Sequence, residues 1–287
     1  FTSPEFNVNI SQLPFFALTA FFLWRSINSN KISNWVLFGV FSALGFLSKY
    51  LFIYLLISIF LFLVIIYFKN KKFFLNYLLS ILISLIILCP HFIWLFKNDF
   101  VTIFYGLNRS SLSENNFLNH LINPTVFIFK QVAVIAPFLI MGSILLKKIK
   151  FKINTQNKKI LFLFTITILP LTLVLLTSII TGAKIRTMWM TPFYLFFGTL
   201  FFEIFKKNIN LKKLKTFYVI FLFFFFLSPA SYLGVSLLDD TKRTDYPGKE
   251  ISRLVQNKWN DNFMNEIKIV VGDEWSAGNL SYHLTSR

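Results

Sequence analysis

The chain has 287 residues, of which 55% are hydrophobic, 19% aromatic and only 14% charged, yet its formal net charge is +17. Soluble domains carry about 25% charged residues, and uncharged apolar runs such as residues 50–68 have the length of a membrane-spanning helix. A nucleic-acid partner would explain the positive charge but not 39 phenylalanines gathered in such runs. The composition therefore predicts a polytopic membrane protein.

Eight apolar runs, bounded by charged or turn residues, predict an all-α transmembrane bundle. Residues 35–68 include two of them. As one helix they would measure roughly 50 Å at ~1.5 Å per residue, against a hydrocarbon core of ~30 Å. We therefore expect a break at Ser48, Lys49 and Tyr50. The expected helices are 12–28, 35–48, 50–68, 73–96, 124–146, 159–181, 187–205 and 214–237.

Lysine and arginine residues mark one face of the expected bundle. Sixteen of the 29 follow the first, third, fifth and seventh runs, and they share a face only if residues 35–68 cross the membrane twice. The positive-inside rule makes that face cytoplasmic. We expect the functional site on the opposite, extracytoplasmic face, together with the remaining segments: residues 1–11, the turn at Lys49, and residues 97–123, 182–186 and 238–287.

The C-terminal tail differs from the rest, since eight of the 12 acidic residues lie from Asp239 onward. Residues 247–258 are typical of an amphipathic helix, and Ile267, Ile269 and Val271 alternate like a strand. We therefore expect a transmembrane domain over residues 1–237 and the start of a small extracytoplasmic α/β domain over 238–287. Because no signal peptide precedes the first apolar run, we expect a fragment that lacks an N-terminal part.

Two ionisable residues stand out on the expected outer face, where charges near a membrane are costly. Glu5 could accept a proton or bind a sugar hydroxyl or a metal, or it could simply stabilise a helix N-terminus. Lys49 could contact a phosphate, or its ammonium could snorkel to lipid headgroups. The single cysteine, Cys89, excludes a disulfide or a paired thiolate metal site within the chain.

Three further groups are candidates on the same face. His91, Lys97 and Asp99 surround Trp94 at the end of the fourth run, either as interfacial anchors or as substrate contacts. Residues 99–109, ending in Arg109, could lie along the interface beside a lipid substrate. Lys184, Arg186 and Trp189 could grip a lipid phosphate or bind headgroups.

Several stretches together resemble a known family. They are Ser3-Pro4-Glu5, Trp24-Arg25, GVFSALGFLSKY (39–50), PHFIWLFKNDFVTIFYGLNR (90–109), RTMWMTPFY (186–194) and VVGDEWSAGNLSYHL (270–284). Their order and spacing are similar to those of the GT-C fold membrane glycosyltransferases. More narrowly, the chain resembles glycosyltransferase family 39 and the RgtA/B/C/D-like bacterial enzymes, relatives of protein O-mannosyltransferases and of the lipid A aminoarabinose transferase.

The resemblance implies transfer of a sugar from a polyprenyl-phosphate carrier to an acceptor hydroxyl on a lipid, glycan or protein, with inversion. It implies a multi-pass protein of the bacterial inner membrane that acts in lipopolysaccharide or other envelope glycan synthesis. The principal catalytic carboxylate would lie before this fragment, which leaves Glu5 as the acid present. Some relatives bind a divalent ion, so metal use stays open. The implied substrate-binding residues are Lys49, Tyr50, His91, Lys97, Asp99, Arg109, Lys184, Arg186 and Trp189.

Two other classes of protein fit the composition. A transporter or lipid flippase would also be polytopic and aromatic, but such folds usually show repeated halves and helices broken near the midplane. Here no repeat is visible and the expected break lies at a face. A structural membrane subunit is the third reading, and the polar outer residues argue only mildly against it.

Overall fold

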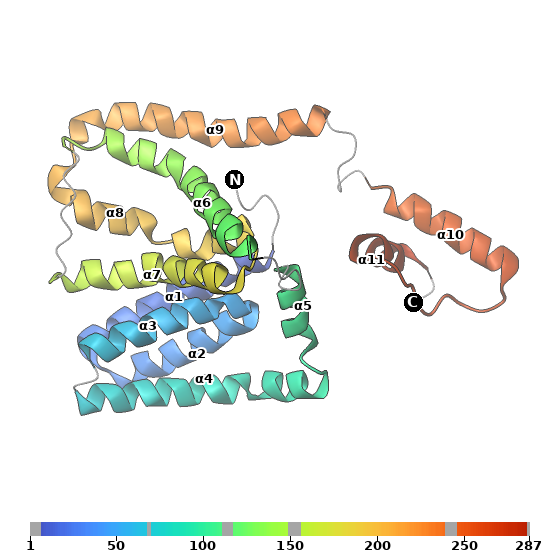
Figure 1. Cartoon of the computed structure of the whole chain (residues 1–287), viewed down its shortest axis with the longest axis horizontal. Helices are drawn as coiled ribbons and strands as arrows, with labels where there is room; N and C mark the ends of the chain where they lie inside the picture. The colour runs from blue at the N-terminus through green and yellow to red at the C-terminus, as the bar shows by residue number, and fades with distance from the viewer. Residues whose placement is uncertain (1–6, 68–69, 111–116, 149–155, 239–245, 286–287) are drawn as a thin grey trace. The chain divides into compact units, whose positions relative to one another are not determined.

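The computed structural model describes residues 7–67, 70–110, 117–148, 156–238 and 246–285. Within these ranges the regular secondary structure is helical, and no strand forms (Figure 1). The α-helices are α1 (Val8–Ser29), α2 (Ile32–Ser48), α3 (Ile53–Ile66), α4 (Lys71–Lys97), α5 (Val101–Arg109), α6 (Asn119–Ile144), α7 (Lys158–Thr181), α8 (Phe197–Phe205), α9 (Leu214–Leu238), α10 (Gly248–Asn262) and α11 (Glu274–His283). The 3₁₀ helices are η1 (Tyr50–Phe52), η2 (Thr187–Tyr194), η3 (Lys206–Asn208) and η4 (Leu211–Lys213).

The chain is a multi-pass membrane protein by the length and apolarity of its helices. Within the described residues, five helices are long and apolar enough to cross a bilayer: α1, α4, α6, α7 and α9. The run expected at 187–205 is not one straight helix, because η2 and α8 meet at a bend of 51°. Pro192 lies in η2 and has no backbone N–H to donate, which favours such an interruption.

The break expected between residues 48 and 50 is confirmed. Lys49 has extended backbone angles, with φ −167° and ψ 132°, between the end of α2 and the start of η1. The Lys49 N–H still donates to Gly45 O at 3.3 Å, and the Ser48 hydroxyl donates to the same oxygen at 2.6 Å. The two resulting helices are shorter than the five that are long enough to span a bilayer, and α3 packs on α7 whereas α2 packs on α1 and α4.

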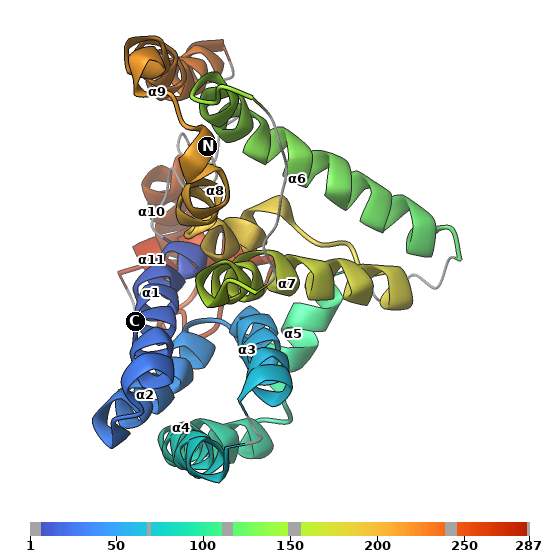
Figure 2. The ribbon, with the colours of Figure 1, turned by 90° about the vertical axis from the view of Figure 1, so that its left-hand side faces the viewer.

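An aromatic core joins α1, η1 and η2. The buried ring of Phe16 lies 6.0 Å from that of Phe52 and 5.8 Å from that of Phe193, between ring centres, and both pairs are edge-on. In the end-on view of Figure 2, α7 lies between α3 and α6 and packs on both. These contacts hold η2 against the N-terminal half of α1, beside the turn at Lys49.

Polar contacts join the loops of the bundle in two separate groups. One group links Asn9 to Lys49, Tyr50 to Thr102, and the Lys184 N–H to Ser110 O at 2.9 Å. The other group links cation-rich segments: the Lys147 N–H donates to Asn208 O, and the Asn210 N–H donates to Leu145 O. The segments that the charge pattern assigns to one face therefore contact one another.

The tail and the part of α9 from Phe223 onward form a second unit, Phe223–Arg287. The helix expected at 247–258 is present as α10, and it packs on α11. The strand expected at 267–271 does not form within the described residues, so an α/β fold is not supported there. A strand requires a partner to satisfy its backbone groups, and no described segment pairs with this one. Ile267 is buried while Ile269 and Val271 are exposed, so the three alternating residues do not share one covered face.

Candidate functional site

Lys49 is the centre of the candidate site. Its ammonium donates a hydrogen bond to Asn9 Oδ1 of α1 and lies 5.0 Å from the centre of the Trp189 ring in η2. The Gln12 side-chain amide, one turn after Asn9, donates to Lys49 O at 3.3 Å. Asn9 and Gln12 are almost fully buried, at 3% and 1% exposed. Two elements distant in sequence, α1 and η2, thus contact one lysine.

The partners of the Lys49 ammonium are an amide oxygen and an aromatic face, and neither carries a negative charge. Lys49 lies in the turn between α2 and η1, outside the helices. Burial lowers the pKa of Lys49 to about 7, because desolvation disfavours the charged form. An anion placed beside the ammonium would reverse that effect and raise the pKa. The site is therefore suited to a negatively charged ligand.

Tyr50, His91 and Thr102 form a second polar group next to Lys49 in the chain. The Tyr50 hydroxyl is hydrogen-bonded to His91 Nε2 at 2.8 Å and to Thr102 Oγ1 at 2.7 Å. The His91 ring stacks on that of Trp94 at 6.0 Å between centres. Two expected site residues, Tyr50 and His91, are thereby brought together, and Thr102 is added by the structure. This group links α5, which buries none of its side chains, to the helical bundle.

Three other expected site residues lie at the end of α4 and along α5. Lys97 is in the last turn of α4, and Asp99, with φ 48°, begins the turn to α5. Arg109 places its guanidinium 5.2 Å from the centre of the Tyr105 ring on α5. All three side chains are exposed. The structure does not bring them into the contacts of Lys49.

The loop after α7 holds the remaining expected residues. Helix α7 ends at Gly182 with φ 69°, and the Ser178 hydroxyl donates to Ala183 O at 2.7 Å, which turns the chain sharply. Lys184 and Arg186 are exposed, and Arg186 O accepts from the Trp189 N–H at 3.0 Å. Of the three residues expected to grip a phosphate, Trp189 alone contacts Lys49 in the described structure.

Glu5 lies outside the described residues. Across the part of the chain that is described, no group of three or more His, Cys, Asp or Glu residues has the spacing to hold a metal ion. The sequence reasoning missed Asn9, Gln12 and Thr102. Buried amides on an apolar helix were the available signal for the first two, since such groups are costly unless hydrogen-bonded.

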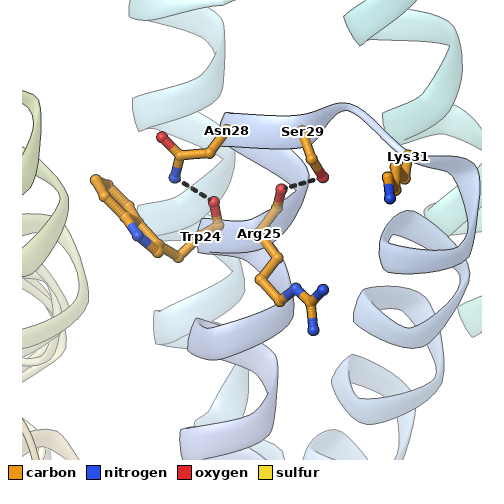
Figure 3. A pocket seen from close by; sticks show the side chains of 5 residues that line it. All are labelled: Trp24, Arg25, Asn28, Ser29 and Lys31. Atoms are coloured by element: carbon orange, nitrogen blue, oxygen red, sulfur yellow. Dashed lines mark hydrogen bonds between the residues drawn. The ribbon is translucent and has the colours of Figure 1, made fainter.

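A hollow of about 230 Å³ lies where α1 ends and α2 begins (Figure 3). In Figure 3 the charged ends of Arg25 and Lys31 point in different directions rather than toward one another. The polar side chains beside them bond their own helix: the Asn28 amide donates to Trp24 O at 2.7 Å and the Ser29 hydroxyl to Arg25 O at 2.8 Å. This hollow has no convergent polar groups, so the Lys49 site remains the candidate.

Replacing Tyr50 by phenylalanine should loosen α5, because it removes both hydrogen bonds that join Tyr50 to His91 and Thr102. Each such bond contributes about 0.5–1.5 kcal/mol, so hydrogen exchange of the α5 amides should speed up roughly tenfold. The matched control is Tyr54→Phe, which removes the single bond to Thr177 Oγ1 at 3.0 Å and should leave α5 unchanged. Equal exchange in both variants would contradict this anchoring role.

These features define a class: a multi-pass, all-α membrane bundle with a partly buried cation in the turn after α2 and no acidic partner for it in the described residues. The comparison with known families then narrows the class. Residues 1–94 match the family model described as dolichyl-phosphate-mannose-protein mannosyltransferase. This match covers the first 94 of the 287 residues, and it agrees with the resemblance of the sequence motifs to the GT-C fold membrane glycosyltransferases. No curated protein and no solved structure matches the chain.

The matched residues include much of the candidate site. Asn9, Gln12, Lys49, Tyr50 and His91 lie within residues 1–94, while Thr102 and Trp189 lie outside. The family match and the candidate site therefore overlap in part.

Proposed function

We propose that the protein transfers a sugar from a polyprenyl-phosphate carrier to a hydroxyl of a lipid, glycan or protein acceptor, with inversion. We place the reaction on the extracytoplasmic face of a bacterial inner membrane, in the synthesis of lipopolysaccharide or another envelope glycan. The observation that carries this proposal is Lys49, a partly buried ammonium held by an amide and an aromatic ring with no described acidic partner. A lipid-linked phosphate supplies the missing negative charge.

The chemistry proposed for Lys49 concerns the leaving group. The acceptor oxygen forms a bond to the anomeric carbon while the bond from that carbon to the carrier phosphate breaks. The electron pair of that bond leaves with the phosphate, whose growing negative charge the Lys49 ammonium stabilises. The acceptor proton passes to a carboxylate, and Glu5 is the acid of this chain that we propose for it.

The surroundings of Lys49 suit a lipid carrier rather than a free nucleotide sugar. Lys49 lies in a turn between two apolar helices. Tyr50, the next residue, joins that turn to α5 through the hydrogen bond between its hydroxyl and Thr102 Oγ1. The exposed side chains of α5 include Val101, Phe104 and Leu107, beside Arg109 at its end. Such an amphipathic helix favours the membrane interface, where the phosphate of a polyprenyl carrier would lie.

The experiment that tests this function supplies a radiolabelled polyprenyl-phosphate sugar to the full-length protein in lipid vesicles. We expect the label to leave the carrier and to appear on an acceptor, and we expect the Lys49→Met variant not to release it. Failure of the wild-type protein to consume any such donor, together with transport of a solute across the vesicle membrane, would overturn the proposal in favour of a transporter.

A further inference from the structure

We infer that Asn9 is a positioning residue, which fixes the Lys49 ammonium by hydrogen bonding while leaving its charge available to a lipid phosphate. This inference rests on the proposed function of Lys49 and extends it to a residue of a different helix. It also assigns a specific purpose to an amide, since a carboxylate at the same place would neutralise the lysine.

The first support is geometric. Asn9 Oδ1 accepts from the Lys49 ammonium, and the side chain of Asn9 is 3% exposed, so the bond is shielded from water. Asn9 lies in the first turn of α1, whose N-terminus is capped by the Asn7 side chain accepting from the Asn9 N–H at 2.9 Å. The cap fixes the backbone of Asn9 and therefore the position of its amide.

Gln12 supports Asn9 from the next turn of the same helix. Residues three apart share a helix face, and the Gln12 amide donates to Lys49 O while Asn9 accepts from the ammonium of the same residue. Lysine is flexible, with several rotatable bonds that must be ordered before it can bind a ligand in one geometry. Gln12 holds the backbone of Lys49 and Asn9 holds its terminal nitrogen before any ligand binds. Less conformational entropy is therefore lost when a ligand binds.

The Lys49 ammonium has no opposite charge among its contacts, because both groups that contact it are neutral. Asparagine and aspartate have nearly the same shape, but only aspartate would form an ion pair with Lys49. The titratable or charged groups on neighbouring elements include Tyr50, Arg25 on α1, Tyr54 on α3, His91 and Lys97 on α4, Tyr194 in η2, and Lys184 and Arg186 before it. The carboxylate of Asp99, in the turn from α4 to α5, is exposed and is not among the contacts of Lys49. Burial lowers the pKa of Lys49 to about 7, so a nearby negative charge has a large effect on whether the lysine is protonated.

The experiment measures binding of undecaprenyl phosphate to the purified protein as a function of pH, with uncharged undecaprenol as the ligand control. In the wild type, affinity should fall as the pH rises through the pKa of Lys49, because the neutral amine no longer attracts the phosphate. Asn9→Asp should bind about tenfold more weakly at pH 6, since its carboxylate competes with the phosphate, and its fall in affinity should move to higher pH. Asn9→Leu should move that fall to lower pH, because the acceptor that favours the charged form is lost.

The opposite displacements of the two pH profiles separate positioning from a purely structural role. A structural role would weaken binding in both variants and leave the pH of the fall unchanged, which would overturn the inference. The matched controls are Asn28→Asp and Asn28→Leu at the other end of α1, and both should keep the wild-type profile. Lys49→Met separates the two levels of the argument: if it binds undecaprenyl phosphate as the wild type does, the proposed function of Lys49 fails, whereas unshifted Asn9 profiles with a defective Lys49→Met refute only the inference about Asn9.

Discussion

Replacing Lys49 by methionine should lower kcat/KM for a polyprenyl-phosphate sugar donor by about a hundredfold or more, the loss typical when one group that stabilises developing negative charge is removed. Lys49 is the ammonium that the structure buries beside Asn9 and Trp189. Methionine has a similar length and fills the same space, so the loss should be chemical. The measurement is the rate of sugar release from the donor in lipid vesicles.

The same variant should not unfold the protein. An ammonium whose pKa burial lowers to about 7 is costly to keep charged inside the fold. The sign follows from proton binding. Between pH 7 and about 10.4 the unfolded lysine holds a proton that the folded one has lost, so folding stability contributed by this group rises with pH across that window and is least below pH 7. Methionine removes this dependence and should raise the thermal midpoint at pH 6.

Two further substitutions complete this test. Lys49→Arg keeps the positive charge and should restore part of the activity, though the larger planar group will not reproduce the contact with Asn9. Lys31→Met, at the exposed end of α1 and α2, should have wild-type activity. Normal activity in Lys49→Met would show that this lysine only snorkels toward the membrane surface.

Replacing Gly39 by alanine should destabilise the bundle by about 1–3 kcal/mol, because overpacking a tight contact forces backbone to move. A Cβ at Gly39 would lie 2.5 Å from Ser80 O, a backbone atom of α4 that cannot rotate away. The same contact is held by hydrogen bonds, with the Ser84 hydroxyl donating to Gly39 O at 2.7 Å and the Ser80 hydroxyl donating to Trp35 O at 2.8 Å. Separating α2 from α4 would break all of them.

The measurement is the thermal midpoint in detergent, with Gly198→Ala as the matched control. A Cβ at Gly198 meets nothing within 4 Å, and alanine favours a helix over glycine, so the control should be neutral or slightly stabilised. Because Tyr50 follows α2 and His91 lies on α4, Gly39→Ala should also weaken the anchoring of α5. Equal midpoints for the two variants would show that α2 and α4 are not packed as closely as described.

The sequence alone determined where the chain becomes helical and where α2 ends. Every apolar run of the expected eight contains a helix, and the break at Lys49 is present. Both results depend on local quantities, namely the length of an apolar run and the cost of placing a cation within it. The pairing of Tyr50 with His91 was also within reach, because both were expected at one end of the bundle.

Two features did not follow from the apolar patterns of the sequence. They are the bend in residues 187–205 and, in the described residues, the absence of a strand at 267–271. The first depends on Pro192 together with how η2 packs against α1 through Phe193 and Phe16. The second depends on a partner strand, which alternation along one segment cannot reveal. In each case a local pattern was read correctly as apolar, but its conformation depended on contacts with distant residues.

Only the tertiary structure determines which residues form the site. Asn9, Gln12 and Thr102 are ordinary polar residues in the sequence, and nothing near them indicates that they meet Lys49 or Tyr50, which lie 37 to 52 residues away. Hydrogen-bond partners across a bundle are set by which helix faces pack together, and that is a property of the whole fold. The sequence by itself identified the unusual lysine, and the fold determined that neutral groups hold it and leave its charge for a ligand.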